Sequence, residues 1–252
     1  MASFQYVSDL HLEFYQKKQK LPPIKPCAPN LIIAGDLGDA FHPLYEQFLA
    51  HVSTLFTYVF LVSGNHEYYW IKHGYRSDVN QWMAYIETKI REIAKKYPNV
   101  IYLQNEAFVI PTPSPNPDGA STYSVSDIVV YGATMWSQID DHHRESVRVN
   151  LNDYHAIPRF TIYHSNQLFH QTIDHLNTAL QQYHDHQFIV ITHHLPSYQL
   201  IHPNYQQSTI NSAFASEVQL ADSPQIIAWF AGHTHSPIDK GKFHVNPIGY
   251  RS

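Results

Sequence analysis

Short runs of hydrophobic residues alternate along the chain with segments in which hydrophobic residues recur every three or four positions. The continuous runs are typical of strands, and they cover residues 4–7, 31–34, 59–62, 100–103, 128–133, 188–192 and 226–231. The recurring positions predict helices, and they are Leu44, Phe48, Val52 and Leu55; Met83, Ile86, Ile90, Ile93 and Tyr97; and Phe169, Ile173, Leu176, Leu180 and Tyr183. Strands and helices therefore alternate, which predicts an α/β fold built in layers.

Two polar segments interrupt this pattern without dividing it. Residues 111–123 contain four prolines within seven positions, which predicts a surface loop or hairpin tip. Residues 137–186 are rich in polar and aromatic side chains and contain eight histidines. We expect one domain over residues 1–252, with the segment 137–186 forming a lid that supplies substrate contacts. The alternative for this segment is a solvated helical excursion.

Composition narrows the class of protein. Hydrophobic residues make up 44% of the 252 positions, enough for a sizeable core, and the formal charge is −5. This charge argues against a duplex nucleic-acid partner, although it does not exclude a nucleotide-sized substrate. The single cysteine, Cys27, excludes an internal disulfide and fits a reducing compartment. No signal-peptide pattern and no apolar run of the ~20 residues that span a bilayer is found, so we expect a cytoplasmic location.

Polar clusters follow five of the predicted strands. They are Ser8-Asp9-Leu10-His11, Gly35-Asp36-Leu37-Gly38-Asp39, Gly64-Asn65-His66-Glu67, His193-His194 and Gly232-His233-Thr234-His235. Residues just past the carboxyl ends of strands meet at one edge of a sheet-based enzyme. Imidazole and carboxylate together suit Zn, Mn or Fe, and one aspartate can bridge two ions ~3.5–4 Å apart. Any one cluster is equally typical of a loop, a turn or a helix cap, but all five in this order predict a metal site.

The order of these clusters resembles the signature of the calcineurin-like metallophosphoesterase superfamily. That signature is DxH, GDxxD, GNHE or GNHD, a histidine after a late strand, and GHxH, and all five parts are present between Asp9 and His235. The resemblance implies an α/β fold of four layers, in which two mixed β-sheets pack face to face and are flanked by helices.

The resemblance also implies a role for each matched residue. Two metal ions, of Mn, Fe or Zn, are expected in the site. One ion is expected to be bound by Asp9, His11 and His235, and the other by Asn65, His193 and His233, with Asp36 bridging them. His193 is preferred to His194 because it comes first after its strand. His66 is the expected catalytic histidine, and Asp39 is the residue expected to orient it.

The expected activity is hydrolysis of a phosphate mono- or diester by a metal-bridging hydroxide, with His66 as the general acid. The substrate is expected to be small, for example a nucleotide. Asp39 is followed by Ala40 and Phe41, whereas the Ser/Thr protein phosphatases of the superfamily have Arg-Gly there, which argues against a protein phosphatase. A nuclease of the same superfamily is one alternative, although no basic run supports it. The other is a scaffold that binds metal without catalysis.

Overall fold

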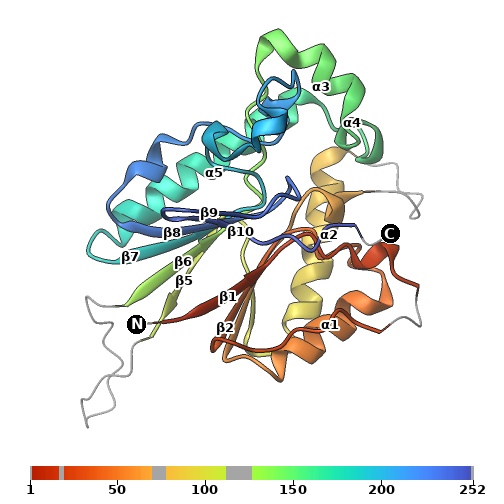
Figure 1. The fold of residues 1–252 in the computed structure, drawn as a ribbon. Coiled ribbons are helices and arrows are strands. Elements are labelled where there is room, and N and C mark those ends of the chain that lie inside the picture. The colour runs from red at the N-terminus through yellow and green to blue at the C-terminus, as the bar shows by residue number, and fades with distance from the viewer. Residues whose placement is uncertain (1, 17–19, 70–77, 112–126, 251–252) are drawn as a thin grey trace.

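Two sheets pack face to face between layers of helices in the computed structural model, which describes residues 2–16, 20–69, 78–111 and 127–250 (Figure 1). The first sheet has the order β1-β2-β3-β4, and all its neighbouring strands are parallel. Its strands are β1 (Phe4–Val7), β2 (Asn30–Ala34), β3 (Tyr58–Val62) and β4 (Val100–Tyr102). The expected four-layer sandwich is confirmed, with this sheet parallel throughout instead of mixed.

The second sheet is mixed and has the order β5-β6-β7-β8-β10-β9. Its strands are β5 (Glu106–Ile110), β6 (Ile128–Gly132), β7 (Gln187–Ile191), β8 (Ile226–Ala231), β9 (Ile238–Lys240) and β10 (Phe243–Val245). The two outermost strands, β5 and β9, run antiparallel to their neighbours. All seven predicted strands are present, and β5, β9 and β10 were not predicted. The predicted loop over residues 111–123 lies, except for Pro111, outside the described residues.

Helices cover the outer face of each sheet (Figure 1). The first sheet carries α1 (Pro43–Ser53) and α2 (Val79–Ala94), and the second carries α5 (Ile162–Gln182). These are the three predicted helices. Two short helices, α3 (Arg144–Asn150) and α4 (Asp153–Ala156), were not predicted. Within the described ranges, no helix is both long enough and apolar enough to cross a membrane.

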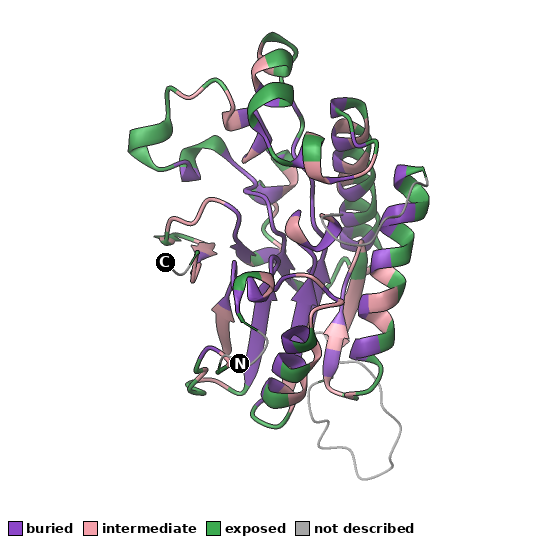
Figure 2. Cartoon of the chain, turned by 90° about the vertical axis from the view of Figure 1, so that its right-hand side faces the viewer, coloured by how far each residue is buried: buried purple, intermediate pink, exposed green. Residues whose placement is uncertain are grey.

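The central strands are buried on both faces, which explains why they are continuous hydrophobic runs. In β2, Leu31 and Ile33 belong to the core under α1 and α2, whereas Ile32 and Ala34 belong to the core between the sheets. Figure 2 shows the strands as the most buried part of the chain, with exposed residues on the outer sides of the helices.

The two parts of the segment over residues 137–186 pack in different places. Phe169 and Leu176 of α5 are buried in the core of the second sheet, as their helical spacing predicted. The preceding part, with α3 and α4, packs around a small cluster of its own that includes Val147 and Leu151. In Figure 1, α3 and α4 lie beyond the sheets, at the top of the molecule.

Candidate metal centre

Loops that follow β1, β2, β3, β7 and β8 meet at one edge of the sandwich. The backbone N–H of Gly232 donates to the carbonyl of His193 over 2.9 Å, and the N–H of Asp9 donates to the carbonyl of Gly35 over 3.1 Å. The two sheets are joined at this edge because the Nδ1 of His193, after β7, donates to the carbonyl of Ala34, at the end of β2, over 2.9 Å. The five polar clusters of the sequence therefore share one site.

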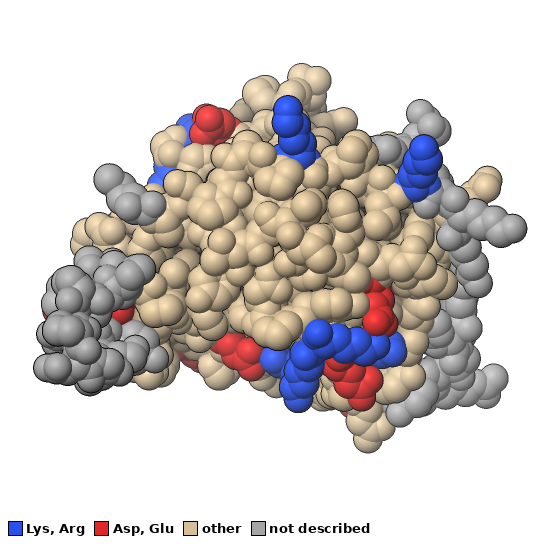
Figure 3. All heavy atoms as spheres, turned by 90° about the horizontal axis from the view of Figure 1, so that it is seen from below, with Lys and Arg blue, Asp and Glu red and all other residues tan. Residues whose placement is uncertain are grey.

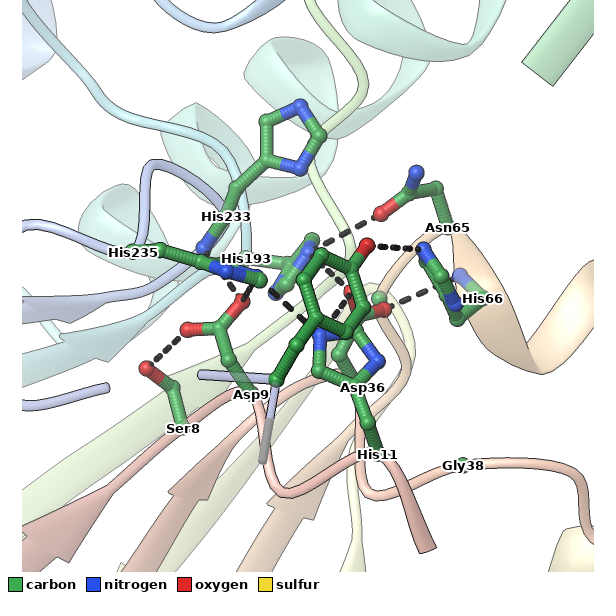
Figure 4. Close-up of polar contacts among 12 residues, drawn as sticks. Ser8, Asp9, His11, Asp36, Gly38, Asn65, His66, His193, His233 and His235 are labelled. Atoms are coloured by element: carbon green, nitrogen blue, oxygen red, sulfur yellow. Dashed lines mark hydrogen bonds and ion pairs between the residues drawn. The ribbon is translucent and has the colours of Figure 1, made fainter. Parts of the chain in front are cut away.

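Carboxylates and imidazoles from these loops face one another at short distances (Figure 4). The Nε2 atoms of His11 and His235 are 3.0 Å apart, and the Nε2 of His235 is 3.3 Å from the Oδ1 of Asp9. The Nε2 of His193 is 3.3 Å from the Oδ2 of Asp36. The ligand atoms of Asp9, His11 and His235 lie within 4.8 Å of one another, and so do those of Asp9, Asp36 and His193.

Asn65 and His233 complete the set of seven predicted ligands. The Oδ1 of Asn65 is 3.1 Å from the Nε2 of His193. The His233 ring centroid is 5.0 Å from that of His193, and its buried Nε2 has no hydrogen-bond partner among the described residues. A buried nitrogen without a partner is unfavourable, and a cation would supply one. The oxygen and imidazole donors suit Zn, Mn or Fe, so the residues fit the metal ions that the sequence predicts.

The backbone at this site adopts a conformation that L-residues avoid. Five of the seven predicted ligands have φ between 49° and 70°, and they are Asp9, His11, Asp36, His233 and His235. The left-handed region costs an L-residue roughly 1–2 kcal/mol, and such strain concentrates at functional sites. The geometry of the ligands is therefore held against a local energetic preference.

Hydrogen bonds from neighbouring groups orient the ligands. The Oδ1 of Asp9 accepts from the backbone N–H of His233 over 3.0 Å, and its Oδ2 accepts from the Ser8 hydroxyl. The bond from the Nδ1 of His193 to a carbonyl leaves its Nε2 free to face the cluster. The buried Glu67 accepts from three backbone N–H groups in the loops that carry Asp36 and Asn65. Burial and the nearby Asp36 carboxylate raise the pKa of Glu67 to about 8.

His66 lies beside the cluster but is held by a residue that was not predicted. Its Nδ1 is 2.9 Å from the Oε1 of Glu13, and its Nε2 is 3.2 Å from the Tyr250 hydroxyl. Burial alone would lower the pKa of His66, but the carboxylates of Asp36 and Glu13 raise it to about 9. No local spacing signalled Glu13 as the partner of His66, because the two residues are 53 positions apart along the chain.

Asp39, the residue expected to orient His66, makes a different contact. Its Oδ1 accepts from the backbone N–H of Phe41 over 2.8 Å, within the loop that leads into α1. The contact expected for Asp39 is made by Glu13, because the loop after β1 brings Glu13 to the Nδ1 of His66.

His194 is buried next to the cluster without facing the carboxylates. Its ring centroid is 4.2 Å from that of His233 and 5.4 Å from that of Trp136. Burial and the neighbouring His193 lower its pKa to about 3, so this ring is neutral. The two adjacent histidines thus occupy different environments, and His193 is the one that faces Asp36.

A cavity of about 410 Å³ opens onto the cluster. Asp36, Asn65, His233 and His235 line its inner end. The rest of the lining is mixed: hydroxyl groups, tyrosines and the carboxylate of Asp153 accompany the apolar side chains of Leu151, Ile201, Ile210 and Phe214 and the amides of Asn150, Asn152 and Asn211. No lysine or arginine of the described ranges lines it. On the face seen in Figure 3, the basic side chains are few and the largest group of them lies against acidic ones.

This chain is similar to known proteins in sequence and in fold. An uncharacterised protein of Acanthamoeba polyphaga mimivirus, L509, is 29% identical over 261 residues, which cover 93% of this chain and 85% of that protein. The crystal structure of phosphopantetheinyl hydrolase from Mycobacterium tuberculosis superposes with a TM-score of 0.71 at 14% identity, and the match covers 99% of this chain and 90% of that one. At this identity the likeness concerns the fold alone. The sequence profile of the calcineurin-like phosphoesterases matches residues 4–237, and the chain therefore belongs to the calcineurin-like phosphoesterase family.

Proposed function

We propose that the protein hydrolyses a small phosphate ester with two metal ions held by the seven residues at the edge of the sandwich. The observation that carries this proposal is the convergence of Asp9, His11, Asp36, Asn65, His193, His233 and His235 from five separate loops. Two groups of three carboxylate or imidazole side chains share Asp9, and within each group the ligand atoms lie within 4.8 Å of one another. The proposed ions are Mn, Fe or Zn, in keeping with these donors.

Each side chain has a separate task in the proposed reaction. Bound cations would lower the pKa of an attacking water and neutralise charge on the phosphate oxygens. His66 donates a proton to the leaving oxygen, and the carboxylate of Glu13, 2.9 Å from its Nδ1, favours the protonated ring. We assign the orientation of His66 to Glu13 instead of Asp39, because the Glu13 carboxylate lies 2.9 Å from Nδ1, and Nε2, which is 3.2 Å from the Tyr250 hydroxyl, is then the nitrogen that would face the substrate.

The cavity favours a substrate with an organic group as well as a phosphate. A space of about 410 Å³ is in the range that encloses a drug-sized molecule. The apolar and amide side chains of its lining suit an uncharged alcohol group of the ester. The phosphate would then bind at the end of the cavity formed by the proposed metal ligands. We propose that the lid consists of residues that line this cavity. They are residues 150–153, from the segment over 137–186, together with residues in the range 201–214.

Metal analysis followed by a substrate screen tests this function. We expect close to two transition-metal ions per chain, and hydrolysis of nitrophenyl phosphate or bis(nitrophenyl) phosphate when Mn, Zn or Fe is supplied. Absence of bound metal, with no activity on addition of Mn, would overturn the proposal. Metal binding without turnover of any mono- or diester would indicate a scaffold. Preference for polynucleotide, with affinity that falls steeply with salt, would indicate a nuclease.

A further inference from the structure

A buried carboxylate from the segment over 137–186 reaches the side chain of a proposed ligand. Asp153 is the first residue of α4 and is 3% exposed. Its Oδ1 accepts from the Nδ2 of Asn65 over 2.7 Å, across 88 positions of the chain. The same Oδ1 accepts from the Tyr69 hydroxyl over 2.8 Å. Such a carboxylate is tolerated in a protein interior only when hydrogen bonds compensate for its burial.

Asn65, Tyr69 and Asp153 form a closed triangle of hydrogen bonds. Besides its bond to Asp153, the Nδ2 of Asn65 donates to the Tyr69 hydroxyl over 3.0 Å. An amide nitrogen has two hydrogens, so both of those on Asn65 are occupied. The amide is therefore held with its Oδ1 on the opposite side, 3.1 Å from the Nε2 of His193. The flipped amide would point its oxygen at the Asp153 carboxylate oxygen and lose that bond, and it would compete with Asp153 for the one hydrogen of the Tyr69 hydroxyl.

The triangle of hydrogen bonds also connects the His66 ring, the lining of the cavity and the proposed metal ligand Asn65. Tyr69 stacks on the His66 ring, with centroids 4.3 Å apart and planes at 30°. Asp153 and its neighbours from Asn150 onward line the cavity. The segment that lines the cavity is thus hydrogen-bonded directly to the Asn65 amide, which faces the proposed metal ligands.

We propose that Asp153 and Tyr69 are positioning residues that aim the Asn65 oxygen at one of the two cations, so that retention of this cation depends on the segment carrying α4. The inference rests on the proposed function, since it requires that metal ions bind here. Partners of metal ligands typically change metal affinity by about 10- to 100-fold when they are removed. Asp153→Ala should weaken one binding event within this range and leave the other close to that of the wild type.

Calorimetric titration of the metal-free protein with Mn²⁺ or Zn²⁺ measures the two binding events separately. Asp153→Asn retains an oxygen acceptor and should restore part of the lost affinity, and Tyr69→Phe should weaken the same event by a smaller factor. Asp141→Asn is the matched control, because Asp141 lies in the same segment with its side chain 85% exposed, and it should bind both ions as the wild type does. Melting of each metal-free variant separates lost affinity from lost folding.

Wild-type affinity for both ions in Asp153→Ala would overturn the inference, and so would equal weakening of both events. If the alanine variant does not fold, the other two variants decide, and wild-type affinity in both of them would overturn it. Failure of the proposed function gives a different result, because the wild-type protein itself would then bind no metal.

Discussion

Replacing Gly64 by alanine places a methyl group against Asp36, the residue proposed to contact both cations. A Cβ at this position would lie 2.8 Å from the carboxylate carbon of Asp36 and 2.7 Å from its backbone nitrogen. The φ of Gly64 is outside the left-handed region, so alanine adds no backbone strain there. The substitution therefore displaces Asp36 itself, because the methyl group meets both its carboxylate and its backbone nitrogen.

The size of the effect follows from these distances. Carbon atoms normally approach one another no closer than ~3.5 Å, so the carboxylate carbon has to retreat by roughly 0.7 Å, and the backbone nitrogen of Asp36 has to move as well. A displacement of about 1 Å at a catalytic group can cost about 10²-fold in rate. We expect kcat to fall by about tenfold to 10²-fold, equivalent to ~1.4–2.7 kcal/mol. Metal affinity should fall for both ions, because Asp36 is proposed to bridge them.

Gly241→Ala is the control, because it introduces backbone strain without a steric clash. Gly241 has a φ of +61°, but a Cβ there meets nothing within 4 Å. This variant should lose roughly 1–2 kcal/mol of stability through strain and keep its kcat and metal content. The assay is hydrolysis of the best substrate from the screen at saturating metal, with the melting temperature of each variant. Wild-type kcat and affinity in Gly64→Ala would refute the reasoning, as would a loss that follows stability in both variants.

Further predictions concern the acid, the paired histidines and a remote carboxylate. His66→Asn should slow hydrolysis of alkyl phosphates by ~10²–10⁴-fold and that of nitrophenyl phosphate much less, since nitrophenolate leaves without a proton; Glu13→Gln should show the same pattern more weakly, and equal losses on both substrates would reject the acid role. His193→Ala should lose one metal ion in elemental analysis while His194→Ala keeps both, and the reverse result would reassign the ligand. Burial raises the pKa of Glu87 above its usual 4.5. A raised pKa of an acid means that the stability it contributes below pH 4.5 is lost as pH rises through the folded-state pKa. Glu87→Gln should therefore melt higher than the wild type, by a margin that grows as pH rises above 4.5 and becomes constant above the folded-state pKa, and a margin independent of pH would contradict this.

Hydrophobic runs were enough to predict a layered α/β fold, whereas the sandwich of two sheets was implied by the resemblance to the family and the edge strands of the second sheet were not predicted. The central strands are buried on both faces, so an unbroken run such as that of β3 signals a strand without any periodicity. Strand β9 consists of Ile238, Asp239 and Lys240 at the edge of its sheet, with two charged residues and no such run. The helices α3 and α4 have seven and four residues, too few to show a helical repeat.

The ligand motifs were predictable because each follows a strand directly, whereas their supporting residues depend on contacts across the fold. Glu13 reaches His66 across 53 positions, and Asp153 reaches Asn65 across 88. No local spacing encodes such pairs. The spacing of Asp39 suggested a partner for His66, but which carboxylate reaches the ring depends on the path of the loop after β1.

The left-handed conformation of the ligand residues has a consequence for how this protein could evolve. Glycine at Asp9, His11, Asp36, His233 or His235 would relieve strained backbone. Replacements that abolish hydrolysis could thus make the metal-free chain more robust, which is the usual conflict between activity and stability. A lineage released from selection for the reaction would be expected to lose these side chains early, while keeping the sandwich that once carried them.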